Sequence, residues 1–306
     1  MHEYLILQTP PAVVEGDHLS LRCHSGDIYK TDKETRFDKD DEKWVITDDI
    51  LHILNVTTAA TGKYKCQKYF RLDHALDKWI SAEAFVTVQE LFSPPEIKVT
   101  PSRVIEGDEM TVRCDTRLDP LRGGTELYFA FYRDGRTVQE YNVSDTYRVR
   151  SSQLEDSGNY TCEVRTVSDT VRKISDGFHI QIYELFPSPE VRVDPSLLVT
   201  EGKQMTLNCE TDPIQSGTTL LYTFYKDSQI IQSADRKTSY VIGKAGEENT
   251  GRYQCSIQSW DGNVRRNSTE VYILIQNYKV QKIIRLVISG FVLAAAVCFI
   301  FLHNKW

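Results

Sequence analysis

The stretch Asp156-Ser157-Gly158-Asn159-Tyr160-Thr161-Cys162 decides the fold of this chain. A tyrosine two positions before a cysteine, with a glycine four positions before it, is typical of the strand that enters a disulfide-linked β-sandwich. In such a strand the tyrosine hydroxyl bonds upstream backbone, and the glycine makes the turn into the strand. The same pattern recurs at Gly62-Lys63-Tyr64-Lys65-Cys66 and at Gly251-Arg252-Tyr253-Gln254-Cys255. The chain is therefore expected to contain three sandwiches.

The residue that opens each turn differs between the copies. Asp156 completes the pattern in the second copy, whereas Ala60 and Asn249 replace the aspartate in the first and third. An aspartate side chain can bond nearby backbone and hold such a turn. We therefore expect the first and third turns to be held less firmly.

A second repeat lies upstream and supplies the partner cysteines. Glu15-Gly16-Asp17 precedes Cys23, Glu106-Gly107-Asp108 precedes Cys114, and Glu201-Gly202 precedes Cys209. Apolar residues alternate before each of these cysteines, which is the period of a half-buried strand. Long regular spacing without a CxxC motif predicts one disulfide per sandwich, formed in an oxidising compartment. The predicted pairs are Cys23 with Cys66, Cys114 with Cys162, and Cys209 with Cys255.

The spacing between each pair matches an immunoglobulin-like sandwich, although the tryptophan expected between the cysteines is absent. Phe37, Phe131 and Phe224 stand near its place and are expected to cover the disulfides. Two linkers, Glu90-Leu91-Phe92-Ser93-Pro94-Pro95-Glu96 and Glu184-Leu185-Phe186-Pro187-Ser188-Pro189-Glu190, separate the copies. Their prolines stiffen them, and their leucine and phenylalanine should bury against neighbouring domains, which predicts a bent, semi-rigid rod.

These patterns predict an all-β protein of three tandem immunoglobulin-like (C2/I-type) β-sandwiches followed by one C-terminal transmembrane helix. The expected boundaries are 1–90, 91–184 and 185–277 for the sandwiches, 278–282 for a juxtamembrane stalk, 283–302 for the helix and 303–306 for a cytoplasmic tail.

Composition narrows the function classes. The net charge of -7 and the lack of a basic cluster argue against nucleic acid as the main partner. The seven histidines are scattered without metal-ligand spacing, and no catalytic or phosphate-binding motif occurs. We therefore expect no enzyme activity, cofactor or metal centre.

The run LVISGFVLAAAVCFIFL at 286–302 carries no charge and, with Ile283 and Ile284, approaches the length that a bilayer needs. Arg285 lies about one turn inside its outer end. One interpretation is a side chain that snorkels to the interface, and the other is an ion pair with an acidic adaptor helix. A small-residue face at Gly290 and Ala294 and the short tail favour the adaptor.

Four glycosylation sequons point to the secretory pathway. Asn159 precedes a predicted strand and should be exposed, whereas Asn55 stands beside Ile53 and Val56, which should be buried. The predicted sites are Asn55, Asn142, Asn159 and Asn267. With the paired cysteines, they predict a single-pass type I protein of the plasma membrane with its N-terminus outside the cell.

The ectodomain resembles the Fc receptor and Fc receptor-like family. The resemblance lies in Tyr4-Leu5-Ile6-Leu7-Gln8-Thr9-Pro10, in Leu21-Arg22-Cys23-His24-Ser25, in the two linkers, and in Leu127-Tyr128-Phe129-Ala130-Phe131-Tyr132-Arg133-Asp134-Gly135. It implies an antibody-contacting first domain and, from the domain order, a further N-terminal domain with a signal peptide that this sequence lacks. It also implies pairing with the Fc receptor gamma chain through Arg285, although Lys282 replaces a polar residue that is often neutral.

The resemblance implies ligand contacts in the loops 25–30 and 68–79 of the first domain. The tryptophan pair with which family members hold an Fc proline would fall at Tyr4 and Gly26, so one wall of that slot is missing here. The candidate ligand-binding residues are Tyr4, Ser25, Gly26, Asp27, Tyr69, Arg71 and Trp79.

Two functions from different classes follow. The first is an activating-type immune receptor that binds a protein ligand, with immunoglobulin Fc among the candidates, and signals through an adaptor paired with Arg285. The second is a non-signalling adhesion or ligand-capturing surface protein in which Arg285 only snorkels. Dependence of surface expression on the adaptor distinguishes them.

Overall fold

The computed structural model describes residues 5–26, 30–42, 45–71, 77–212, 218–276 and 287–295. Contacts divide the chain into two compact units. One unit comprises Met1–Ser102, Met110–Val149 and Ser157–Gln181, and the other comprises Arg103–Glu109, Arg150–Asp156 and Ile182–Trp306. The predicted residues Tyr4, Asp27 and Arg285 lie outside the described residues.

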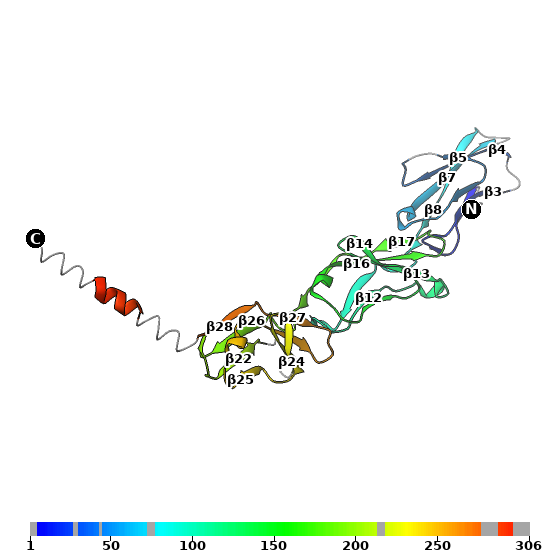
Figure 1. The fold of residues 1–306 in the computed structure, drawn as a ribbon. Helices are drawn as coiled ribbons and strands as arrows, with labels where there is room; N and C mark the ends of the chain where they lie inside the picture. Colours follow the sequence, from blue (N-terminus) through cyan, green and yellow to red (C-terminus); the bar gives the residue numbers. More distant parts are fainter. Residues whose placement is uncertain are drawn as a thin grey trace, which may run out of the picture. The chain divides into compact units, whose positions relative to one another are not determined.

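The first sandwich consists of two antiparallel sheets and a short parallel pair (Figure 1). One sheet has the order β1-β3-β6, with β1 at Leu5–Gln8, β3 at Leu19–Ser25 and β6 at Ile50–Ile53. The other has the order β5-β4-β7-β8, with β5 at Val45–Thr47, β4 at Lys30–Lys39, β7 at Gly62–Arg71 and β8 at Lys78–Val86. The parallel pair joins β2 at Val13–Val14 to β9 at Val88–Gln89, and η1 is a 3-10 turn at Thr58–Ala60.

The remainder of the first unit repeats this architecture. One sheet joins β10 at Glu96–Thr100, β12 at Met110–Asp115 and β15 at Thr146–Val149. The other joins β14 at Arg136–Asn142, β13 at Leu127–Arg133, β16 at Gly158–Thr166 and β17 at Arg172–Ile174, with β18 at Phe178–Ile180 also on β16. The 3-10 turn η2 covers Pro120–Arg122.

The second unit contains the third sandwich and two short pieces from earlier in the chain. Its first sheet joins β20 at Glu190–Asp194, β22 at Met205–Glu210 and β25 at Ser239–Ile242. Its second joins β21 at Leu198–Thr200, β28 at Val271–Gln276, β26 at Gly251–Ser259, β23 at Leu220–Lys226 and β24 at Gln229–Asp235, with β27 at Arg265–Asn267 on β26. The unit also holds the parallel pair of β11 at Val104–Ile105 with β19 at Ile182–Tyr183, and the turns η3 at Leu154–Asp156 and η4 at Glu247–Asn249.

The cores form where the strand period places apolar side chains inward. Each predicted cysteine pair is joined, over separations of 43, 48 and 46 residues. Phe37, Phe131 and Phe224 are fully buried and lie opposite the second cysteine of their sandwiches, which confirms their predicted role. A ring at this position fills the space that the usual tryptophan occupies.

The turns that precede Tyr64 and Tyr253 were expected from the sequence to be held less firmly, and the structure corrects this for one of them. The hydroxyl of Tyr64 donates to the carbonyl of Ala60, and that of Tyr253 donates to the carbonyl of Asn249, each at 2.8 Å. The side chain of Asn249 also accepts from the backbone N–H of Gly246 at 2.8 Å, much as Asp156 accepts from Gln153 at 3.0 Å. The prediction of a weaker turn was therefore wrong for the third sandwich, because an amide oxygen accepts this bond as a carboxylate does.

Both linkers bury their apolar residues as predicted, with Leu91, Phe92, Leu185 and Phe186 at most 9% exposed. In the first unit, Glu15 Oε2 lies 2.8 Å from Lys173 Nζ, which also donates to the carbonyl of Phe92 at 2.7 Å. In the second unit, Nη2 of Arg266 donates hydrogen bonds to both carboxylate oxygens of Glu106, at 2.7 and 2.8 Å. In the first two copies of the Glu-Gly turn, a base on a later strand thus neutralises the glutamate.

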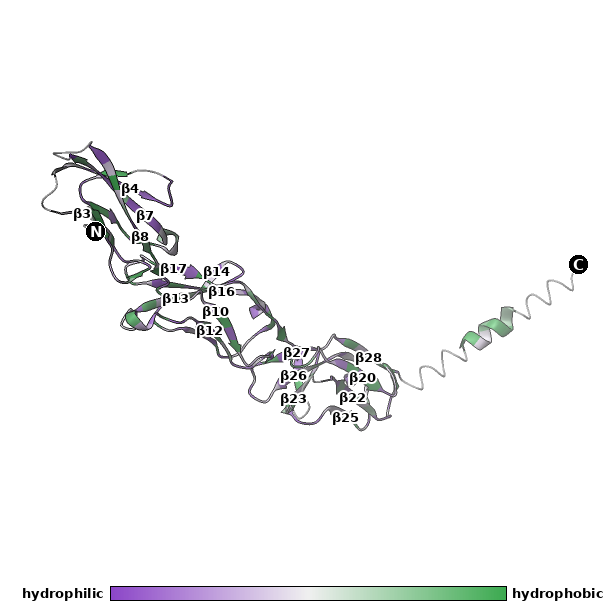
Figure 2. Cartoon of the chain, turned by 180° about the vertical axis from the view of Figure 1, so that it is seen from behind, coloured by the Kyte–Doolittle hydropathy of each residue, from purple (hydrophilic) through white to green (hydrophobic). Residues whose placement is uncertain are grey.

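A helical stretch at 287–295 lies inside the predicted membrane segment, and Figure 2 shows that it is mostly apolar. Within the described part of the chain, no helix is both long and apolar enough to cross a membrane.

Candidate ligand-binding face

The outer face of the β5-β4-β7-β8 sheet carries an aromatic and aliphatic patch. Strand alternation places Phe37, Cys66 and Phe70 inside, so Arg36 and Tyr69 lie on the outer face of the sheet. Arg36 pairs with Ile46 on one side, and Tyr69 pairs with Trp79 on the other. We call Arg36, Ile46, Tyr69 and Trp79 the outer patch.

Side-chain contacts hold the outer patch together. The guanidinium of Arg36 lies 4.0 Å from the centroid of the Trp79 ring, a cation–π contact. The Tyr69 and Trp79 rings meet edge to face at 5.4 Å. Ile46 is 58% exposed and Trp79 is 41% exposed, so much of this apolar surface remains open to solvent.

Arg36 is the polar centre of the outer patch. No carboxylate among the described residues forms an ion pair with it, and its buried Nε has no hydrogen-bond partner there. A guanidinium has a planar fork of donors that suits a carboxylate or carbonyl acceptor, and its contact with the indole limits its motion. Arg, Trp and Tyr are also the residue types that most often dominate binding energy at protein interfaces.

On the corresponding face of the second sandwich the charged groups pair with one another, although the buried hydroxyl of Tyr141 has no hydrogen-bond partner among the described residues. Arg172 lies 3.0 Å from Glu163, and Glu163 also accepts a 2.9 Å bond from the hydroxyl of Tyr132. Burial, together with Glu163, raises the pKa of Tyr132 and of Tyr141, so both phenols stay neutral at physiological pH. A face whose charges already have partners gains little from a new ligand.

On the same face of the third sandwich, the exposed arginine is also hydrogen-bonded to neighbouring side chains. Arg265, which pairs across the ladder with Gln258, donates to the hydroxyls of Ser256 at 2.9 Å and Tyr225 at 2.6 Å. The positions of Tyr69 and Trp79 hold Arg165 and Arg172 in the second sandwich and Gln258 and Arg265 in the third, so aromatic groups there are peculiar to the first sandwich.

The structure brings together some of the predicted ligand residues and separates others. Tyr69 and Trp79 are in contact, and Arg71 is exposed at the end of the same β7 strand. Ser25 ends β3 in the opposite sheet, followed by half-buried Gly26. Arg36 and Ile46 were not predicted from the sequence. The outward position of Arg36 could have been inferred from Phe37, the inward-facing residue that follows it on the strand.

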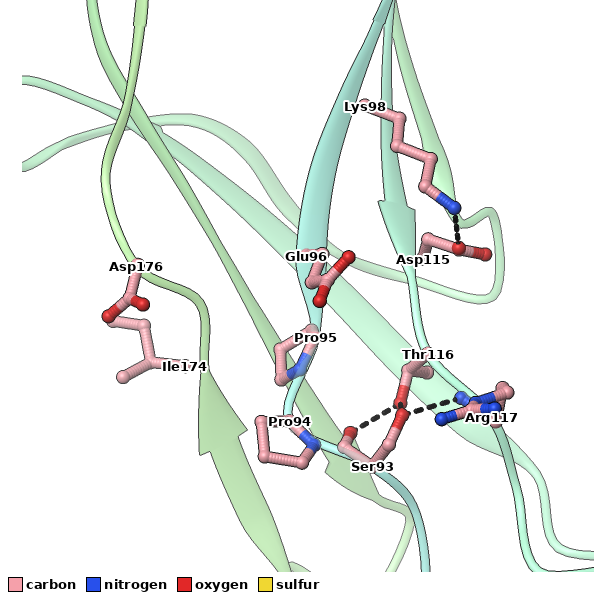
Figure 3. A pocket seen from close by; sticks show the side chains of 10 residues that line it. All are labelled: Ser93, Pro94, Pro95, Glu96, Lys98, Asp115, Thr116, Arg117, Ile174 and Asp176. Carbon is pink, nitrogen blue, oxygen red and sulfur yellow. Dashed lines mark hydrogen bonds and ion pairs between the residues drawn. The ribbon is translucent and has the colours of Figure 1, made fainter.

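A hollow at the first linker is less suited to a ligand (Figure 3). Lys98 and Asp115 pair with each other there, and the hydroxyl of Thr116 donates to the Ser93 carbonyl at 2.6 Å. The backbone of Arg117 donates to the Ser93 hydroxyl at 3.0 Å. These bonds attach the linker to the second sandwich.

All four sequon asparagines are exposed, including Asn55, although Val56 beside it is buried as expected. Asn55 adopts a positive φ of 49°, a conformation that asparagine tolerates and that turns its side chain out of the ladder. Glycan attachment at the four positions stays a prediction.

Comparison with known proteins gives a consistent set of similarities. The immunoglobulin domain family matches residues 94–182 and 187–273. The chain is 31% identical to human Fc receptor-like protein 3 over 267 residues, covering 83% of this chain and 35% of that protein. It is 29% identical to human Fc receptor-like protein 6 over 275 residues, covering 84% of this chain and 60% of that protein.

A solved structure of the second Ig-C2 domain of human Fc receptor-like A is 34% identical to the matching part of this chain, with a TM-score of 0.27. The match covers 29% of this chain and 98% of the chain in that structure. The chain spans between about a third and three fifths of the length of the two curated relatives above.

Proposed function

Because the chain belongs to the immunoglobulin superfamily and, within it, to the Fc receptor-like family, we propose that it is a cell-surface receptor whose first sandwich binds a protein ligand through the outer patch. The observation that supports this proposal is a partly exposed Arg36–Trp79 contact flanked by Tyr69 and Ile46, in which the arginine has no ion-pair partner among the described residues. Immunoglobulin Fc is the first ligand to test, given the family.

The binding test compares two Arg–Trp pairs of the same chain. Trp79→Ala should weaken binding of immobilised immunoglobulin Fc about 30-fold, because it removes a central aromatic anchor worth about 2 kcal/mol. Trp260→Ala is the matched control, since Trp260 is 65% exposed and lies under Arg236 at 5.5 Å on the third sandwich. Surface plasmon resonance on the purified full chain measures both variants.

A wild-type chain that binds no immunoglobulin class would exclude immunoglobulin Fc as the ligand. Equal binding by wild type and Trp79→Ala, with loss in Trp260→Ala, would move the site away from the first sandwich. Arg36→Lys adds a second check, because it keeps the charge but loses the planar donor fork.

We further propose that 283–302 spans the plasma membrane and that Arg285 pairs with an acidic helix of an adaptor like the Fc receptor gamma chain. The uncharged run at 286–302 supports this proposal. An arginine at the outer end of such a run is stabilised by an acidic partner helix.

Coexpression with the gamma chain tests the adaptor. Arg285→Leu should abolish co-precipitation and lower the surface level, whereas Lys305→Leu, which removes one charge at the other end of the segment, should change neither. Equal co-precipitation and surface level of wild type and Arg285→Leu would reject the pairing. That outcome would favour the second candidate, a non-signalling adhesion or ligand-capturing protein in which Arg285 snorkels.

A further inference from the structure

Two histidines from neighbouring strands lie side by side on the other sheet of the first sandwich. His52 belongs to β6 and pairs across the ladder with Ser20 of β3. His18 immediately precedes β3, so it is the diagonal neighbour of His52 on the same outer face. Both imidazoles are exposed to solvent.

The ring nitrogens are closer than two unrelated surface histidines would be. His18 Nε2 and His52 Nδ1 are joined by a 3.2 Å hydrogen bond, and the ring centroids are 5.1 Å apart. Two nitrogens bound to one tetrahedral zinc through bonds of about 2.0 Å would lie about 3.3 Å apart. A metal could therefore replace the shared proton of this hydrogen bond with little change in the separation of the two nitrogens.

The surroundings also favour a cation. The hydroxyl of Ser20 lies 3.0 Å from the same nitrogen, His52 Nδ1, and a bound metal would displace this contact. His52 lines a shallow hollow together with Asp48 and Asp49. Asp49 is paired with Lys68, while exposed Asp48 contributes negative charge to the hollow that His52 lines.

We propose that His18 and His52 form a two-histidine surface site for a divalent transition metal of the zinc class, with water in the remaining coordination positions. Imidazole nitrogen is a preferred ligand for zinc, copper and nickel. Among the described residues no group of three or more histidine, cysteine, aspartate or glutamate side chains is arranged to hold a metal, so the site is bidentate. The site lies on the sheet opposite the outer patch and does not depend on the proposed ligand.

Calorimetric titration of the full chain, purified in a mild detergent, with zinc chloride tests the proposal. We expect one zinc ion per chain whose affinity falls at least tenfold in His18→Ala and in His52→Ala. His24→Ala and His179→Ala are matched controls, because each removes one histidine that lies elsewhere on the described surface. The controls should bind zinc as the wild type does.

Thermal unfolding supplies a second readout that separates loss of the site from loss of the fold. Zinc should raise the unfolding temperature of the wild type but not that of His52→Gln, which keeps a polar side chain opposite Ser20. The proposal is overturned if the wild type binds no zinc, or if the double variant H18A/H52A binds it as tightly as the wild type does.

Discussion

Lys68 distinguishes the core of the first sandwich from its two repeats. It faces inward beside Cys66 and is 3% exposed, whereas Val164 and Ile257 occupy the same position in the other sandwiches. Its Nζ lies 2.5 Å from Asp49 Oδ1, which also accepts a bond from the hydroxyl of Thr35 at 3.0 Å. A buried ammonium is tolerated only with such a partner.

Removing either member of this pair should have unequal effects. Asp49→Asn should lower the free energy of unfolding by about 2 to 4 kcal/mol, because Lys68 is left buried without a counter-charge. Lys68→Met should change it by less than about 1 kcal/mol, because Asp49 is half exposed and can be solvated. Urea denaturation measures both, and equal losses would show that the lysine itself fills an essential space.

Stability at alkaline pH should depend on Tyr253. Burial raises the pKa of Tyr253 to about 12, compared with about 10 for a tyrosine in an unfolded chain. The folded state therefore holds this proton more tightly, and the resulting stabilisation is complete below about pH 10 and is lost as pH rises to about 12. Tyr253→Phe should flatten this part of the pH–stability curve, and an unchanged curve would assign the loss to other groups.

At the scale of elements, the Glu-Gly turn is the repeated device that ties parts of each unit together. Glu106 is 3% exposed and bidentate with Arg266, and Gly107, at a φ of 93°, leaves a Cβ position only 3.1 Å from a methyl carbon of Val264. The third copy differs, because exposed Glu201 has no ion pair among the described residues and Gly202 has open space around it. One sequence motif thus serves as a buried contact or as a solvated turn.

Substitution of the glutamate in the second and third copies of the Glu-Gly turn should distinguish the buried contact from the solvated turn. Glu106→Gln should lower the free energy of unfolding by about 3 kcal/mol, because Arg266 loses its buried counter-charge. Glu201→Gln should change it by no more than about 0.5 kcal/mol, as expected for an exposed residue. Guanidinium denaturation of both variants checks the difference, and similar small effects would mean that water can replace Glu106.

The same comparison extends to the glycines. Gly107→Ala should be more destabilising than Gly202→Ala, since both adopt positive φ but only Gly107 also meets a packed neighbour. Differential scanning calorimetry should show the larger fall in unfolding temperature for Gly107→Ala. Equal falls would indicate that backbone strain alone, and not the contact with Val264, limits the residue there.

At the scale of the whole molecule, disulfides and exposed sequons together predict passage through the secretory pathway. Each disulfide closes a loop of more than 40 residues, worth about 4 kcal/mol in the simple chain-entropy account. Treatment of the cell-derived chain with an N-glycosidase should remove mass corresponding to glycans at Asn55, Asn142, Asn159 and Asn267. Thr57→Ala should remove one glycan without changing the backbone at Asn55, and a chain with no N-glycans would contradict the predicted route.

The sequence by itself determined the sandwich class, the cysteine pairs, the buried phenylalanines and the apolar linker residues. Each of these features depends on local sequence period and spacing, because successive side chains of a strand point alternately into the core and toward solvent. The sequence also identified Tyr69 and Trp79 through family resemblance.

Only the tertiary structure decided that Arg36 lies on Trp79, that His18 meets His52, and that Glu106 meets Arg266. These contacts join residues from strands whose register is set by the packing of the whole sandwich, and no local pattern encodes which outward-facing side chains become neighbours. The same reason explains Asn249, whose capping bond depends on the turn it closes and not on its similarity to aspartate.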